Sequence, residues 1–71
     1  MTSEPFLRQV TKRELEILKL CAEGWTDYDI GAQLSISYKT VAHHLDNIRT
    51  RLDAKNRPHL VAIAFRRRLI E

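Results

Sequence analysis

Apolar residues recur at helical spacing in four segments of the chain, and each segment begins beside a residue that favours a helix start. These starts are Thr11, Thr26, Ser37 and Asn56, whose side chains can accept a hydrogen bond from a free amide in the first turn. Gly24 closes the first segment, since glycine readily adopts the left-handed conformation that ends many helices. The pattern predicts an all-α domain, a four-helix bundle with helices at about 11–23, 26–34, 37–52 and 56–69.

Three local features carry further expectations for the fold. Glu14 lies three residues after Thr11, which is the spacing of a capping box. Gly31 lies inside the second predicted helix, where glycine costs about 1 kcal/mol relative to alanine, so we expect another helix to cross closely there. Tyr28 is expected to be a half-buried packing residue. Residues 1–9 show no helical periodicity and are interpreted as a flexible tail or the end of a linker.

Only Ser35 and Ile36 separate the second and third predicted helices, and two short helices joined by a tight turn form a helix-turn-helix. One narrow stripe of the third helix is apolar and is expected to face the core: Val41, Leu45, Ile48 and Leu52. The opposite side is polar and carries Lys39, His43, Asp46 and Thr50, flanked by Ala42 and Asn47. His44 is expected at the edge of the core stripe.

The charge of the chain is unevenly distributed. Residues 1–34 contain four cations and six acids, a net charge of −2, whereas residues 35–71 contain eight cations and three acids, a net charge of +5. This asymmetry favours a surface that binds a polyanion, of which nucleic acid is the commonest. A basic half that is merely solvated is the alternative. A chain of 71 residues has one small core with little room for a substrate cleft, so an enzyme is disfavoured.

Catalytic and metal chemistry find little support in the residues. His43 and His44 are adjacent, so on a helix they point about 100° apart, and no cysteine or acid completes a metal ligand set. Cys21 lies in an apolar helical pattern without a positioned base, and a single cysteine fits a reducing compartment. We expect no catalytic residue, no metal and no cofactor. No apolar run is long enough to span a membrane, so no membrane partner is expected.

The polar side of the third predicted helix has the chemistry for reading DNA. In a helix-turn-helix the second helix enters the major groove, and its N-terminal residues meet base edges. Ala42 is small enough to contact a thymine methyl group, and His43 can donate to guanine or to a phosphate. Phosphates repel Asp46, but its carboxylate can accept from the cytosine amino group, so we interpret it as a specificity element. Alternatively, Asp46 is a solvated residue that pairs with Arg49 or Lys39.

Several short motifs occur together between residues 10 and 57, along VTKRELEILKLCAEGWTDYDIGAQL and SISYKTVAHHLDNIRTRLDAKNR. They are T-K-R-E at 11–14, Leu18, Glu23 with Gly24, Ile30, S-x-K-T-V at 37–41 and K-N-R at 55–57. In this combination the chain resembles the LuxR-type, or GerE-like, DNA-binding domain of bacterial transcription regulators over nearly its whole length. The resemblance implies that residues 10–71 form a four-helix bundle whose second and third helices are the helix-turn-helix.

The resemblance also implies a partner and the residues that meet it. The partner is double-stranded DNA with a two-fold symmetric site, and RNA polymerase is a further candidate. By position, the base-contacting residues correspond to Ala42, His43 and Asp46, and the backbone contacts correspond to Lys39, Thr40 and Asn47. The fourth helix carries more apolar residues than one inward stripe needs, and the resemblance implies a homodimer contact there when the domain is on DNA, at Val61 and Phe65.

The segment PHLVAIAFRRRLIE is most similar to the quorum-sensing branch of these regulators. We therefore expect the DNA-binding part of a quorum-sensing type regulator, cytoplasmic at the bacterial nucleoid, with no small-molecule ligand in this segment. The alternatives are a stand-alone GerE-like regulator or the output domain of a response regulator. A promoter-reading sigma-factor region shares a similar framework but ordinarily ends soon after its recognition helix. A helical module that binds an acidic protein would show no salt-dependent binding to a palindromic duplex.

Overall fold

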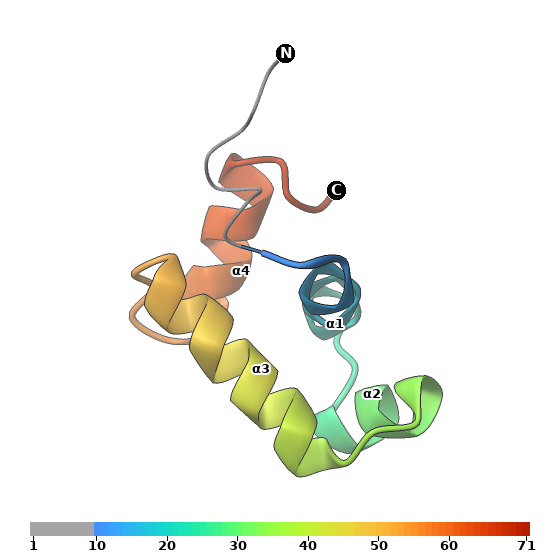
Figure 1. Ribbon diagram of the computed structural model, residues 1–71. Helices are drawn as coiled ribbons and strands as arrows, with labels where there is room; N and C mark the ends of the chain where they lie inside the picture. The colour runs from blue at the N-terminus through green and yellow to red at the C-terminus, as the bar shows by residue number, and fades with distance from the viewer. Residues whose placement is uncertain (1–9) are drawn as a thin grey trace.

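The computed structural model describes residues 10–71, and within them it contains four helices and no strand. In chain order these are α1 (Lys12–Ala22), α2 (Asp27–Leu34), α3 (Tyr38–Arg51) and α4 (Arg57–Arg66) (Figure 1). The predicted all-α fold and the order of its helices are confirmed, whereas the tail expected at residues 1–9 lies outside the described part. None of the helices in residues 10–71 has the length and apolar character that a membrane span requires.

Each helix begins where the sequence predicts, because the side chain of the preceding residue accepts a hydrogen bond from the amide three positions on. The four pairs are Thr11 with Glu14, Thr26 with Asp29, Ser37 with Thr40 and Asn56 with His59, at 2.9–3.1 Å. In the first pair the Glu14 carboxylate also accepts from the Thr11 amide at 3.0 Å. The predicted capping box is therefore present.

The four helices of the described chain each end beside a residue with left-handed backbone, and only one of these residues is glycine. Gly24, which the sequence singles out, has φ 95°, and Ser35, Asp53 and Arg68 adopt the same region at φ 57–61°. Arg68 explains why α4 ends at Arg66 and not near residue 69 as expected. Its turn lets the amide of Leu69 donate to the carbonyl of Ala64 at 2.8 Å, which is the Schellman arrangement.

The core lies between α3 and the other three helices. The predicted stripe of α3 is buried, with Val41, Leu45 and Ile48 fully inaccessible to solvent and Leu52 nearly so. Against it pack side chains from α1, α2 and α4: Ile17, Leu18, Ile30, Leu60, Ile63 and Ala64. Full burial of such a side chain contributes about 1.5–3 kcal/mol each. The stripe therefore fixes the rotation of α3 and leaves its polar side uncovered, along the lower left of Figure 1.

The helix-turn-helix is held by a close approach of backbone at Gly31 of α2. A Cβ atom on Gly31 would lie 2.6 Å from the carbonyl oxygen of Ile36 and 3.3 Å from the amide nitrogen of Tyr38. The expected close neighbour is thus present, but it is the turn into α3 and not the side of a crossing helix. The amide of Ile36 also donates to the Gly31 carbonyl at 2.9 Å, so the turn and the end of α2 form one unit.

The expectation for Tyr28 is wrong. Its side chain is 66% exposed, because its position on the short α2 points away from the core side that carries Ile30. One face of the ring is covered by Tyr38, the first residue of α3, with ring centroids 4.2 Å apart and planes inclined by 29°. The two rings join the first turns of α2 and α3.

The close approach at Gly31 generates a prediction for stability. Gly31→Ala should lower the free energy of unfolding by about 1–3 kcal/mol, the usual cost of inserting a group into packed surroundings, even though alanine is the better helix former. Urea unfolding followed by circular dichroism measures the change. Gln33→Ala is the control, because it is an exposed position on the same helix. A Gly31→Ala chain that is more stable than the wild type would contradict the account.

Candidate nucleic-acid interface

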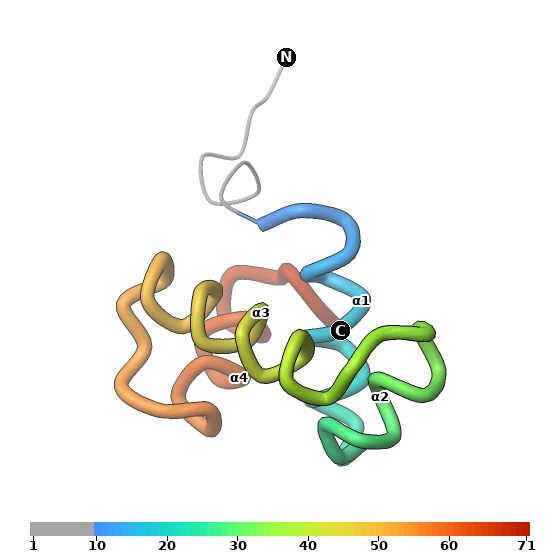
Figure 2. The backbone as a smooth tube through the Cα atoms, turned by 60° about the horizontal axis from the view of Figure 1, so that its bottom comes forward, coloured from blue at the N-terminus to red at the C-terminus, as the bar shows by residue number. Residues whose placement is uncertain are grey.

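The residues predicted to contact DNA lie together on the outer side of α3. Lys39, Thr40, His43, Asp46 and Asn47 are exposed, and Ala42 is half-buried where α3 meets α2. They occupy the first ten residues of the helix, from the turn after Ser37 onward. In Figure 2 this stretch lies in front, beside α2, with α4 behind it. The structure therefore presents these six side chains on one uncovered surface that comprises the N-terminal two-thirds of α3.

The N-terminal end of α3 is suited to an anion. Ser37 accepts from the amide of Thr40, and the two hydroxyl groups lie 3.0 Å apart. The first turn of α3 contains no acidic residue, so nothing there compensates the positive end of the helix dipole. By contrast, the first turn of α2 carries Asp27 and Asp29. Of the two helices in this motif, α3 offers the end to which a phosphate is attracted.

An ion pair between distant segments fixes α3 on α1. The carboxylate of Glu14, whose side chain is only 8% exposed, accepts a hydrogen bond from the guanidinium of Arg51 at the end of α3. His44 Nδ1 lies 3.8 Å from the same carboxylate, so His44 sits at the edge of the core stripe as expected. This pairing could not be predicted from the sequence, because the capping box already explains Glu14 and Arg51 lies 37 residues away.

The environment of Glu14 shifts its pKa. Burial of the side chain raises the pKa of Glu14. The hydrogen bonds from Arg51 and from the Thr11 amide, with the nearby charges of Arg51 and His44, lower this pKa by more than burial raises it. The net pKa lies below the ordinary value of 4.5. The carboxylate is therefore ionised in the folded chain at neutral pH, as its partners on α3 require.

A second ion pair joins the helix-turn-helix to α4. The guanidinium of Arg57 donates to both carboxylate oxygens of Asp27, at 2.9 and 3.0 Å. Such two-pronged pairs are stronger and more directional than single contacts, and the Asp27 carboxylate raises the pKa of Arg57. The first turn of α2 is thereby tied to the first turn of α4, which sequence reasoning also missed because the partners lie 30 residues apart.

Among residues 10–71, Asp46 has one cation within ion-pair distance. Its Oδ1 atom lies 3.8 Å from Nε of Arg49, and the Asp46 side chain is 68% exposed. A pair this long and this exposed contributes only a few tenths of a kcal/mol. Arg49 is also held elsewhere, since it donates to the carbonyl of Ala54 at 3.2 Å. Asp46 therefore remains accessible, and both interpretations of it stay open at the level of the free protein.

The surface of α4 carries the residues predicted for self-association. Val61 is half-buried and Phe65, one turn later, is 46% exposed. The inner side of α4 is used by the core through Leu60, Ile63 and Ala64. The apolar residues of α4 that the core does not use thus include Val61 and Phe65, which remain partly accessible to solvent.

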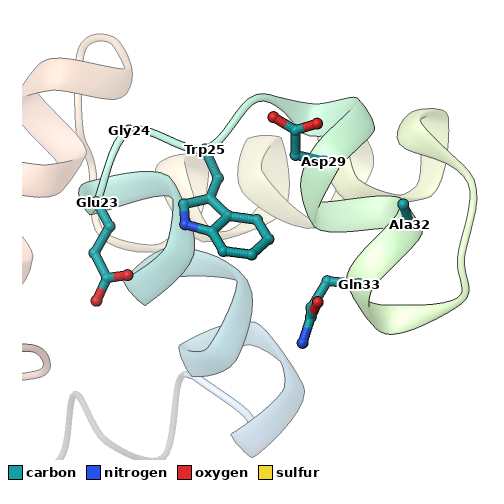
Figure 3. Close-up of a pocket in the computed structure, with 6 residues that line it drawn as sticks. All are labelled: Glu23, Gly24, Trp25, Asp29, Ala32 and Gln33. Carbon is teal, nitrogen blue, oxygen red and sulfur yellow. The ribbon is translucent and has the colours of Figure 1, made fainter.

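A shallow depression of about 440 Å³ lies beyond the interface, between the end of α1 and the outer side of α2 (Figure 3). Its lining comprises Glu23, Gly24, Trp25, Asp29, Ala32 and Gln33, which include no nucleophile beside a base.

Cys21 is half-buried nearby, and burial raises the pKa of its thiol, which keeps it protonated at neutral pH. Within residues 10–71 no group of three or more His, Cys, Asp or Glu side chains is placed to hold a metal ion.

Comparisons with known proteins agree with this geometry. A family model described as bacterial regulatory proteins, luxR family, matches residues 8–64. The chain is 44% identical over 70 residues to the oxygen regulatory protein NreC of Staphylococcus haemolyticus (strain JCSC1435). It is 43% identical to the protein of that name from Staphylococcus aureus (strain JH9). Both alignments cover 99% of this chain and 32% of the relative, so the chain spans about a third of the length of these curated relatives.

The Glu14 ion pair generates a prediction for pH dependence. Because the pKa of Glu14 is lowered by folding, its stabilisation is complete above the ordinary value of 4.5 and is lost as the pH falls through the folded-state pKa. Glu14→Gln keeps the capping box but removes the charge, so it should lower the free energy of unfolding by about 1–3 kcal/mol at pH 7.

The difference between Glu14→Gln and the wild type should shrink as the pH falls below the ordinary value of 4.5, because the wild-type carboxylate then takes up a proton more readily in the unfolded chain than in the folded one. Urea unfolding at several pH values measures it, and Glu16→Gln is the control on the same helix, since its pair with Arg13 is exposed. A Glu14→Gln deficit that stays constant from pH 7 to pH 3 would contradict an ionic origin.

Proposed function

The chain belongs to the LuxR family of bacterial regulatory proteins, and on that premise we propose that it binds double-stranded DNA sequence-specifically with α3 in the major groove. The single observation that carries this proposal is the division of α3 into two sides. One side is locked into the core by Val41, Leu45 and Ile48, and the other presents hydrogen-bonding groups to solvent. A rigidly held polar helix that follows a tight turn is the element that reads base edges in helix-turn-helix proteins.

We assign base contacts to Ala42, His43 and Asp46. They lie in the N-terminal part of α3, which enters the groove most deeply in this class of protein. The small, half-buried Ala42 permits close approach of the helix to a thymine methyl group. His43 can donate a hydrogen bond to a base acceptor such as guanine O6 or N7. Asp46 can accept one from the amino group of cytosine, so the two side chains favour different bases at neighbouring positions.

We assign backbone contacts to Lys39, Thr40 and Asn47. All three side chains are exposed to solvent on α3. Lys39 supplies the positive charge that neutralises a phosphate, whereas Thr40 and Asn47 supply neutral donors. Contacts of this kind position the helix on the duplex without selecting a sequence.

We further propose that the chain is the DNA-binding output domain of a longer regulator of the response-regulator type. The support is that the named relatives are oxygen regulatory proteins and that the chain corresponds to 32% of their length. The expected quorum-sensing role finds no support in these relatives. The alternative drawn from the sequence, the output domain of a response regulator, fits them better. A two-fold symmetric site, with one domain on each half, follows from self-association through Val61 and Phe65 of α4.

The proposal predicts a characteristic salt dependence. The wild-type chain should bind a duplex selected from a random pool with an affinity that falls steeply as salt rises, because bound phosphates release counterions. Lys39→Ala should weaken binding to every sequence alike and reduce the magnitude of the salt slope by about 1. Fluorescence anisotropy over a salt series measures both quantities, with Lys12→Ala, an exposed lysine at the start of α1, as the control. Absence of salt-dependent DNA binding by the wild type would refute the function.

The role of Asp46 gives a second prediction. Asp46→Asn retains the size but removes the repulsion from phosphates, so affinity for unrelated DNA should rise. Discrimination at one base pair should fall by about 1–3 kcal/mol, the usual worth of a good base contact. The measurement compares both chains on operators changed one base pair at a time. Uniformly tighter binding with unaltered base preference would mean that Asp46 only tunes charge, together with Arg49.

The apolar pair on α4 gives a third prediction. The domain should be monomeric at low concentration but occupy two half-sites about one helical turn apart, because a single-helix contact is too small for a stable free dimer. Phe65→Ala should abolish cooperative filling of the second half-site and leave affinity for one half-site unchanged. Footprinting measures this, with Trp25→Ala as a control that truncates another partly exposed aromatic away from α4. A lone wild-type footprint at saturation would rule out the dimer.

A further inference from the structure

Two exposed tyrosines form a stack at the point where the helix-turn-helix would meet the DNA backbone. Tyr28 is 66% exposed and Tyr38 is 40% exposed. Their ring centroids are 4.2 Å apart. Within residues 10–71, neither ring contacts any other aromatic ring. Neither tyrosine hydroxyl has a hydrogen-bond partner in that part of the chain.

The stack lies beside the proposed reading surface. Tyr38 directly precedes Lys39 and lies one helical turn before Ala42, on the side of α3 that faces α2. Figures 1 and 2 both show the first turn of α2 next to the first turn of α3, so the two rings occupy the rim of that surface. In a bound helix-turn-helix the first helix crosses the DNA backbone while the second enters the groove.

The carboxylates that flank Tyr28 in the sequence are turned away from this rim. Asp27 is engaged with Arg57 of α4 through two hydrogen bonds. Asp29 is among the residues that line the depression beside Trp25 (Figure 3). A phosphate that approaches the stack would therefore meet two neutral hydroxyl donors and the cation of Lys39, with both neighbouring acids directed elsewhere.

We propose that the hydroxyl groups of Tyr28 and Tyr38 donate hydrogen bonds to the phosphodiester backbone at the edge of the major groove, and so position α3 for base reading. This inference rests on the proposed function and adds two residues that neither the sequence nor the resemblance assigned to DNA. Tyrosine hydroxyls are regular phosphate donors in protein–DNA complexes. Stacking restricts the rotation of both rings before DNA binds, so less side-chain entropy is lost when the hydroxyls engage.

Neutral donors differ from cations in a measurable way. A lysine that contacts a phosphate displaces a counterion and contributes to the salt slope, whereas a tyrosine hydroxyl displaces none. Removing a hydroxyl should therefore lower affinity equally at all salt concentrations. The expected loss is about three- to tenfold for each hydroxyl, the range for a hydrogen bond that water can replace only in part.

The test uses Tyr28→Phe, Tyr38→Phe and the double variant, which keep the ring stack. Affinity is measured over a salt series for a duplex selected by the wild-type chain and for an unrelated duplex of the same length. We expect weaker binding to both duplexes, an unchanged salt slope, an unchanged base preference and an unchanged unfolding midpoint. Lys39→Ala is the contrasting variant, because it should change the slope.

Duplexes with single uncharged methylphosphonate linkages locate the contact. At the phosphate that a tyrosine engages, the Phe variant and the wild type should bind equally well, whereas elsewhere the variant should remain weaker. Phe variants that bind as tightly as the wild type overturn the inference while the proposed function stands. A changed base preference would also overturn it, since the hydroxyls would then read bases. Failure of the wild type to bind either duplex refutes the proposed function itself.

Discussion

The rotation of α3 about its own axis is the constraint on which the rest of the structure depends. Val41, Leu45 and Ile48 are completely buried, and turning the helix by a quarter would exchange them for polar side chains in a core that cannot solvate them. Everything on the opposite side is therefore presented outward by necessity. In this chain that side carries a cation, a histidine, an acid and amide and hydroxyl groups, which is a surface equipped for recognition.

Two ion pairs then hold the helices in their positions relative to one another. Glu14 with Arg51 ties its end to the start of α1, and Asp27 with Arg57 ties the start of α2 to the start of α4. Both join segments that are far apart in the sequence and close in space, and both involve a carboxylate that is more buried than its cation. In a core this small, such pairs hold the helix-turn-helix against the bundle in one orientation, which a rigid reading surface requires.

The sequence predicted most of what depends on local spacing. Capping residues such as Thr11 and Asn56 located all four helix starts in the described chain, because a cap acts over three residues. Helix ends were less predictable, since Arg68 adopts a left-handed backbone that its side chain does not favour and so ends α4 early. The polar side of α3 followed from helical periodicity, and its assignment to DNA came from the preceding tight turn, the charge asymmetry and the resemblance. The Tyr28–Tyr38 stack could not be predicted, because it depends on how the two helices pack.

Amide chemical-shift mapping of the isotope-labelled chain, titrated with a duplex that it selects from a random pool, shows which helix meets DNA. The largest changes should fall on residues 38–47 of α3 and on the first turn of α2. Trp25, Ala32 and Gln33, which line the depression and lie outside the first turn of α2, should change little. Changes concentrated at Trp25 and its neighbours, with α3 unaffected, would contradict the assignment of α3 as the element that reads DNA.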